Sequence, residues 1–146
     1  MDKVRRVDVS DLDIIFNLER LFFLDFWTKS QVLNQISHKN NINFCIESDS
    51  KIVAYIFARY YLDFTEILKI GVSRGFRKVG LASILMKEIE LLCLNMKIKK
   101  ILLEVREANI AAVSLYKKLN YKIDGIRKNY YKKYNDDGIL MSKKLI

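Results

Sequence analysis

The segment from residue 65 to residue 92 constrains the fold more than any other part of the chain, because it joins a strand pattern to a helix pattern through a basic turn. Residues 65–72 form a largely apolar run with β-branched side chains, which predicts a strand. Apolar side chains then recur at helical spacing from Leu81 to Leu92, which predicts an amphipathic helix. A strand that leads directly into a helix indicates an α/β protein.

The turn that joins this strand to this helix has the composition of an anion site. Arg77 and Lys78 precede Gly80, and Ala82 leaves a second position without a bulky side chain, so the main chain can approach an anion closely. Free N–H groups and the positive end of the helix dipole would favour a pyrophosphate there. Neither the G-x-x-x-x-G-K-S/T spacing nor the G-x-G-x-x-G spacing occurs, which disfavours Walker-type and Rossmann-type loops. A solvated connection between two elements would have the same composition.

The remaining pattern predicts the order βααβββαβαββ, an α/β domain with a mixed sheet. Thr28 and Gln31 form a capping box for the second helix, and Asp8 or Ser10 is expected to cap the first. Asn120 suits the left-handed position that ends the last helix. A strong turn signal occupies residues 135–138. Strands are expected at residues 3–7, 44–46, 52–61, 65–72, 100–106, 121–131 and 139–144, and helices at 12–22, 29–37, 81–92 and 109–119.

Length and composition indicate one soluble domain. The chain has 146 residues, 51% of them hydrophobic, so residues 1–146 are expected to form a single domain around one core. No apolar run reaches about 18 residues and the N-terminus lacks a secretion signal, which predicts a cytoplasmic protein. Cys45 and Cys93 lie among apolar neighbours and are expected to be buried free thiols. His38 is the one histidine and is expected at the surface, so no metal site is expected.

The net charge of +9 is concentrated at one end of the chain. Residues 97–146 hold 13 basic and 5 acidic side chains and therefore carry +8 of it. A nucleic-acid surface, an anionic cofactor with ribosomal surroundings, and plain lysine-rich codon bias are three interpretations of this excess. The composition alone leaves them open.

Three segments together resemble one family. They are Arg77-x-x-Gly80-x-Ala82, the run Leu103-Glu104-Val105-Arg106 followed by Asn109, and residues 112–121. Together they resemble the GNAT superfamily of acetyl-CoA-dependent N-acetyltransferases. Residues 127–131 and 137–141 are similar to those of its ribosomal-protein-alanine N-acetyltransferase (RimI) family. The resemblance implies a mixed, mostly antiparallel sheet flanked by helices, with a splayed strand pair holding acetyl-CoA.

The resemblance also implies site residues. Glu104 would accept the proton of the amine, directly or through water, and Tyr116 would protonate the departing CoA thiolate. Main-chain groups of residues 70–72 would hold the pantetheine arm, the basic loop would cradle the pyrophosphate, and Asn109 would contact the pantetheine or thiol end. The implied cofactor-binding residues are Ile70, Gly71, Val72, Arg77, Lys78, Val79, Gly80, Leu81, Ala82, Ser83 and Asn109. Without the resemblance, Glu104 could point to solvent, Tyr116 could pack in the core and Asn109 could be a helix cap alone.

The expected reaction is direct acetyl transfer to the N-terminal amine of a protein. An amine attacks a thioester only when neutral, and an α-amino group, with a pKa of about 7.7 to 8.0, loses its proton more easily than lysine, at about 10.4. RimI-like enzymes are associated with an N-terminal alanine of a ribosomal protein, which makes a protein N-terminus the expected partner, with no membrane and no required nucleic acid. The alternatives are acetylation of lysine side chains or of a small-molecule amine. Less favoured is a basic RNA-binding module that stacks bases on Tyr130, Tyr131 and Tyr134.

Overall fold

The computed structural model describes residues 2–146, in which a seven-stranded sheet has the order β1-β2-β3-β4-β5-β7-β6. The order of elements along the chain confirms the predicted βααβββαβαββ pattern. The strands are β1 (Asp2–Arg6), β2 (Asn41–Ser48), β3 (Lys51–Tyr60), β4 (Phe64–Val72), β5 (Lys100–Arg106), β6 (Lys122–Tyr131) and β7 (Asp136–Lys144). The helices are α1 (Leu12–Phe22), α2 (Lys29–Ser37), α3 (Leu81–Asn95) and α4 (Ile110–Lys118).

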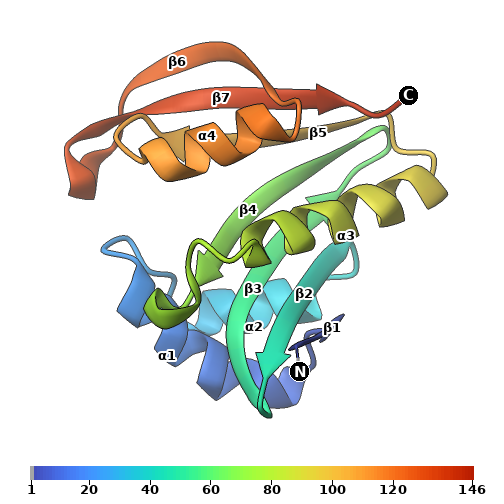
Figure 1. Ribbon diagram of the computed structural model, residues 1–146, viewed down its shortest axis with the longest axis vertical. Coiled ribbons are helices and arrows are strands. Elements are labelled where there is room, and N and C mark those ends of the chain that lie inside the picture. The colour runs from blue at the N-terminus through green and yellow to red at the C-terminus, as the bar shows by residue number, and fades with distance from the viewer. Residues whose placement is uncertain (1) are drawn as a thin grey trace.

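The sheet splits in its middle. Strands β4 and β5 are parallel and pair only over Phe64–Glu66 and Lys100–Leu102, whereas the other neighbouring strands are antiparallel. Figure 1 shows β4 and β5 meeting at their right-hand ends and separating toward the left. The expected mixed, mostly antiparallel sheet with a splayed strand pair is therefore confirmed.

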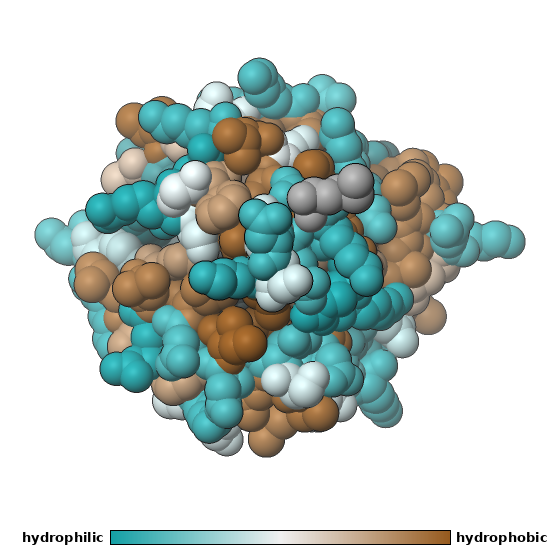
Figure 2. All heavy atoms as spheres, turned by 60° about the horizontal axis from the view of Figure 1, so that its bottom comes forward, coloured by the Kyte–Doolittle hydropathy of each residue, from teal (hydrophilic) through white to brown (hydrophobic). Residues whose placement is uncertain are grey.

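Two apolar clusters lie on opposite faces of the sheet, because successive side chains of a strand point to opposite sides. In β3, Ile56 packs in the cluster under α3 and α4, whereas Tyr55 and Phe57 pack in the cluster under α1 and α2. Figure 1 shows α3 and α4 on the near face and α1 and α2 on the far one. Figure 2 brings the α1 end forward and shows apolar groups interrupted by polar ones on its surface.

Local signals fix several boundaries. The Thr28 N–H donates to Gln31 Oε1 at 2.8 Å and the Gln31 N–H donates to Thr28 Oγ1 at 3.1 Å, which confirms the capping box. Asn120 has a φ of 72°, in the left-handed region as expected. Of the two proposed caps before α1, Asp8 is the one that accepts the Ser10 N–H, at the start of a 3-10 turn over Val9–Asp11 that leads into α1.

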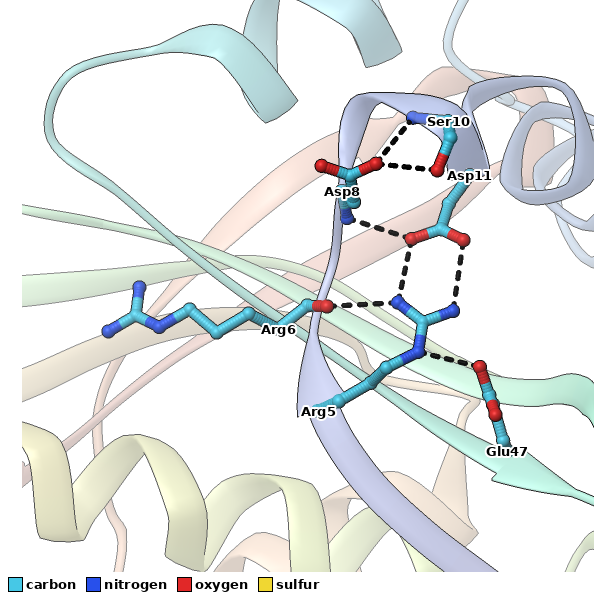
Figure 3. Close-up of polar contacts among 6 residues, drawn as sticks. All are labelled: Arg5, Arg6, Asp8, Ser10, Asp11 and Glu47. Atoms are coloured by element: carbon cyan, nitrogen blue, oxygen red, sulfur yellow. Dashed lines mark hydrogen bonds and ion pairs between the residues drawn. The ribbon is translucent and has the colours of Figure 1, made fainter.

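An ionic cluster around Arg5 fixes the entry to α1 (Figure 3). The Arg5 guanidinium donates to both carboxylate oxygens of Asp11, at 2.8 and 2.9 Å, and to Glu47 at 2.6 Å. Asp11 also accepts the N–H of Asp8 at 2.8 Å. These bonds from Arg5 keep the pKa of Asp11 below its usual range. The cluster therefore ties β1 and β2 to the 3-10 turn that leads into α1.

Two strands begin three residues earlier than the sequence predicts. Strand β2 begins at Asn41 and not at residue 44, because the amides of this polar start are used inside the protein: the buried Asn43 Oδ1 accepts from Gln35 Nε2 at 2.8 Å. Strand β7 begins at Asp136, inside the predicted turn, since a 3-10 turn at Lys132–Tyr134 and the left-handed Asn135 already reverse the chain. Asparagine and aspartate favour turns locally, and tertiary hydrogen bonds override that preference here.

The cysteines are free and buried, as predicted. His38 is partly buried, and its Nδ1 accepts the Asn40 N–H at 3.0 Å. Residues 2–146 contain no group of three or more His, Cys, Asp or Glu side chains placed to hold a metal ion. None of the helices in this range combines the length and the apolar character needed to cross a membrane.

Candidate active site

The basic turn after β4 presents backbone N–H groups to solvent. Lys78 and Gly80 both adopt left-handed conformations, with φ values of 64° and 88°. Gly80 is the N-cap of α3 and supplies no side-chain oxygen, so no side chain caps the first N–H groups of this helix. Arg77 and Lys78 are exposed beside them. The arrangement suits an anion at the start of α3.

Gly71 has a packing role that the sequence did not indicate. A Cβ at this position would lie 2.7 Å from Cδ2 of Phe22 and 3.2 Å from Cε1 of Tyr55. Glycine therefore allows the end of α1 to approach β4 closely. Its neighbours Ile70 and Val72 pack against the opposite cluster, under α3.

A cleft of about 540 Å³ opens on the α1–α2 side of the sheet, beside the point where β4 and β5 separate. Its walls come from the segment between α1 and α2, from β4 and β5, and from the end of β6. The lining residues are Asp25, Trp27, Glu66, Ile67, Leu68, Lys69, Glu104, Tyr130, Tyr131, Lys132 and Lys133. The cleft brings Glu104 together with aromatic and charged side chains from segments far apart in the sequence.

Glu104 is mostly withdrawn from water. Its side chain is 21% exposed, and its Oε2 is buried without a hydrogen-bond partner in residues 2–146. Its Oε1 lies 3.9 Å from Nη2 of Arg127. Burial raises the pKa of Glu104, the positive charge of Arg127 lowers it, and the negative charge of Glu66 raises it, with a net increase. A carboxylate with a raised pKa and a free oxygen is suited to accept a proton.

Tyr116 is not in this cleft. It lies on the opposite face of the sheet, in the cluster with Leu103 and Val105, with its ring 6.0 Å from that of Tyr121. Its hydroxyl has no hydrogen-bond partner within residues 2–146, and burial raises its pKa. Glu104 and Tyr116 therefore approach the strand split from opposite faces.

Asn109 caps α4. Its Oδ1 accepts the Ala112 N–H at 3.3 Å, and the Asn109 N–H donates to the carbonyl of Arg106 at 3.0 Å. This position places Asn109 at the end of β5 that diverges from β4.

A buried ionic cluster behind the cleft was missed by sequence reasoning. Glu19 is fully buried, and its carboxylate lies 2.9 Å from Lys69 Nζ and accepts bonds from the Tyr55 hydroxyl at 2.5 Å and the Trp27 N–H at 2.9 Å. The Lys69 ammonium also lies 4.0 Å from the ring centroid of Phe23. The sequence did hold a signal, since Glu19 falls four residues after Ile15 on the apolar stripe of α1.

Comparisons with known proteins agree with this geometry. The chain is 29% identical over 139 residues to a Bacillus subtilis protein provisionally named a ribosomal-protein-bS18-alanine N-acetyltransferase, covering 94% of this chain and 92% of that one. The crystal structure of the ribosomal-protein-S18-alanine N-acetyltransferase from Escherichia coli superposes with a TM-score of 0.93 at 23% identity, covering 99% and 94% of the two chains. Arabidopsis thaliana NAA60 in complex with acetyl-CoA superposes with a TM-score of 0.89 at 17% identity, covering 99% of each chain.

The split sheet, the uncapped start of α3 and the half-buried carboxylate beside the split fit an enzyme that moves an acetyl group from acetyl-CoA to an amine. The model of the acetyltransferase (GNAT) family matches residues 12–121, which hold β4, the basic loop, α3, β5 and α4. The chain therefore belongs to the acetyltransferase (GNAT) family, whose acetyl donor is acetyl-CoA.

Proposed function

We propose that this chain is a single N-acetyltransferase domain that acetylates the N-terminal amine of a protein, with an N-terminal alanine of a ribosomal protein as the acceptor. The observation that carries this proposal is the cleft at the strand split, where the buried Oε2 of Glu104 has no partner in residues 2–146. The names of the Bacillus subtilis and Escherichia coli relatives support the acceptor. Ribosomal proteins are made in the cytoplasm, so this acceptor would place the enzyme there.

The donor would enter from the loop side of the split. Exposed N–H groups at the start of α3, with Arg77 and Lys78 beside them, would hold the pyrophosphate. The pantetheine arm would follow the main chain of residues 70–72, which has no strand partner on the β5 side beyond Glu66. Asn109, at the diverging end of β5, would contact its thiol end. In this arrangement acetyl-CoA would be held mostly by the main chain of residues 70–72 and by residues 77–83.

The acceptor would enter through the cleft on the opposite face. Glu104 would take one proton from the amine, the amine nitrogen would then bond to the acetyl carbon, and the bond from that carbon to sulfur would break. Because the acceptor starts as an ammonium, a second proton leaves the nitrogen as the amide forms. Tyr116, on the other face of the sheet, would protonate the departing thiolate and would then be reprotonated through solvent by a proton equivalent to the one that the nitrogen releases. Because base and acid approach from opposite faces, donor and acceptor can be bound at the same time, which suits direct transfer.

The acidic and basic side chains that line the cleft balance one another. Asp25, Glu66 and Glu104 line it together with Lys69 and two lysines at the end of β6. Lys69 is already neutralised by Glu19 and by Asp25, whose carboxylate lies 3.7 Å away. The positive excess of the C-terminal third therefore does not continue unopposed into the cleft.

Replacing Tyr116 with phenylalanine should lower kcat by about tenfold while leaving acetyl-CoA affinity unchanged, because only the proton for the thiolate is lost. The matched control is Tyr121→Phe, which removes a neighbouring phenol that donates to Glu90 at 2.9 Å. That change should lower the melting temperature and leave kcat intact. Steady-state kinetics and thermal melts of both variants check this. Full activity of Tyr116→Phe would show that Tyr116 does not protonate the thiolate.

Gly80→Ala should weaken acetyl-CoA binding by about tenfold and lower the free energy of unfolding by roughly 1 kcal/mol. An alanine at a φ of 88° is strained, and its Cβ would occupy open space where the main chain should meet the pyrophosphate. Gly75 is the control, since it also faces open space but has no left-handed φ. Calorimetric titration with acetyl-CoA and urea unfolding should separate the two variants, and equal affinities would contradict the proposed loop.

Mass spectrometry of two peptides incubated with the enzyme and acetyl-CoA tests the acceptor. One peptide has a free N-terminal alanine, and the other is blocked at its α-amine and carries an internal lysine. Acetylation of the first alone is expected. Acetylation of the second alone would make the protein a lysine acetyltransferase. If neither peptide is acetylated, small-molecule amines should be tested as acceptors.

A further inference from the structure

Glu66 lies at the vertex of the strand split. It pairs with Leu102, the last pair of the short parallel ladder between β4 and β5. Glu104 follows Leu102 by two residues, so Glu66, Leu102 and Glu104 point to the same face of the sheet. Both carboxylates line the cleft of about 540 Å³. The divergence of the strands thus leaves two acidic side chains on one wall, one at the vertex and one just beyond it.

Glu66 is a carboxylate that the fold itself does not use. It has no hydrogen bond and no ion pair with any side chain in residues 2–146. Its cross-strand neighbour on β3 is Arg59, but Arg59 Nε donates to Gln35 Oε1 at 2.7 Å. The nearby cation on β4, Lys69, is bound to Glu19 at 2.9 Å. A partly exposed carboxylate that has no ion pair of its own in residues 2–146 can bind a cation from outside.

The two carboxylates influence each other. The negative charge of Glu66 is among the causes that raise the pKa of Glu104, after burial and against Arg127. The charged and titratable groups that face this pair from the surrounding elements are Asp25, Arg59, Lys69, Arg127, Tyr130, Tyr131, Lys132 and Lys133. Among the basic groups, Arg127 contacts Glu104 itself, at 3.9 Å and with a side chain 54% exposed. The vertex therefore holds two carboxylates, of which only Glu104 has a cation within 4.0 Å in residues 2–146.

We propose that Glu66 is a second substrate-binding carboxylate, which holds the ammonium form of the acceptor at the vertex of the split while Glu104 takes its proton. At pH 7 most of a free α-amine, with a pKa of about 7.7 to 8.0, is protonated, so the abundant form is the cation. One proton moves from the ammonium nitrogen to Glu104 and leaves a neutral amine. That amine then forms its bond to the acetyl carbon, the bond to sulfur breaks, and the thiolate takes a proton from Tyr116. The nitrogen loses its second proton to solvent, from which Tyr116 is reprotonated. This inference rests on the proposed function and adds how the acceptor is captured.

Glu66→Gln tests the inference. The variant keeps the shape of the side chain but loses its charge, so KM for the acceptor peptide should rise by about tenfold. The acid limb of kcat/KM should move to lower pH, because a negative charge that raises the pKa of Glu104 is gone. A structural role alone would not move that limb. An unchanged KM together with an unchanged limb would overturn the proposal.

The control variant is Asp124→Asn. Asp124 is an exposed acid on β6 that pairs with Lys122 at 3.8 Å and does not line the cleft. Asp124→Asn changes the net charge by the same amount as Glu66→Gln but outside the cleft, so its KM and pH profile should match those of the wild type. Should Glu66→Gln not fold, Glu66→Thr removes the same charge with a β-branched side chain that suits a strand.

A binding cycle without turnover separates this inference from the proposed function. In the presence of CoA, the wild type should bind a peptide with a free N-terminal ammonium about tenfold more tightly than its desamino analogue, and in Glu66→Gln this preference should shrink. An equal preference in both proteins would overturn the role of Glu66. If the wild type acetylates only a lysine peptide, the proposed acceptor fails, and the same cycle run with lysine and norleucine peptides still tests whether Glu66 holds the ammonium.

Discussion

Glu104→Gln is expected to lower kcat by about 100-fold or more, because the variant keeps the size of the side chain but cannot accept a proton. The carboxylate is 21% exposed, and its Oε2 has no partner in residues 2–146. The affinity for acetyl-CoA should not change, since Glu104 lines the acceptor cleft and lies outside the loop at residues 77–83. Initial rates with a free N-terminal peptide, together with calorimetric titration of acetyl-CoA, measure both quantities.

The pH profile gives an independent check of the same residue. Burial raises the pKa of Glu104, so kcat/KM of the wild type should fall, as pH decreases, at a higher pH than an ordinary glutamate would give. Protonated Glu104 cannot act as a base, which fixes the sign: activity is lost on the acid side. In Glu104→Gln this limb should disappear along with the rate.

Glu107→Gln is the matched control for Glu104→Gln. Glu107 directly follows β5, and its exposed side chain lies outside the cleft. This variant should retain the activity and pH profile of the wild type. Full activity of Glu104→Gln, or an equal loss in both variants, would show that Glu104 is not the proton acceptor.

Lys69→Met should lower the free energy of unfolding by about 3 kcal/mol or more. The change leaves the Glu19 carboxylate, which is 0% exposed, without the ammonium now 2.9 Å away. The Tyr55 hydroxyl would still donate to Glu19, since burial and the charge of Glu19 raise the pKa of Tyr55 and keep it protonated. The Trp27 N–H would also remain, at 2.9 Å, but two neutral donors do not replace a cation beside a buried charge. Urea unfolding with comparison of midpoints and slopes measures the loss.

Two further variants show whether the loss comes from the buried charge. Adding Glu19→Gln to Lys69→Met removes the unpaired charge and should restore part of the stability. Lys29→Met breaks a pair at 2.5 Å with Asp13, but both partners are mostly exposed, so it should cost less than about 1 kcal/mol. If Lys69→Met were as mild as Lys29→Met, the cluster behind the cleft would not stabilise the fold. Because this effect concerns folding and the Glu104 effect concerns turnover, each prediction can fail alone.

The loss of Lys69 should also change the shape of the acceptor cleft. The same carboxylate that binds Lys69 accepts the Trp27 N–H at 2.9 Å, and Trp27 lines the cleft. The cluster therefore connects the stability of the α1 side to the shape of the acceptor site.

The amino-acid sequence by itself determined the order of elements and several of their ends. A capping box such as Thr28 with Gln31 and a left-handed position such as Asn120 are set by residues within one turn of each other. The same holds for the glycine before α3, whose φ of 88° follows from a tight turn into a helix. Turn chemistry and helical spacing act over three or four residues, so they can be identified along the chain.

Only the tertiary structure decided which side chains meet at the split. Strand β4 leaves β5 after Glu66 and Leu102, although both strands continue, and no local pattern marks that point. Glu19 finds its cation fifty residues away, whereas Glu104 is half-buried and its buried Oε2 is unpaired in residues 2–146. The cost of burying a charge depends on partners that folding brings together from distant segments, which is why the sequence could suggest these carboxylates but only their packing could distinguish a stabilising ion pair from a candidate base.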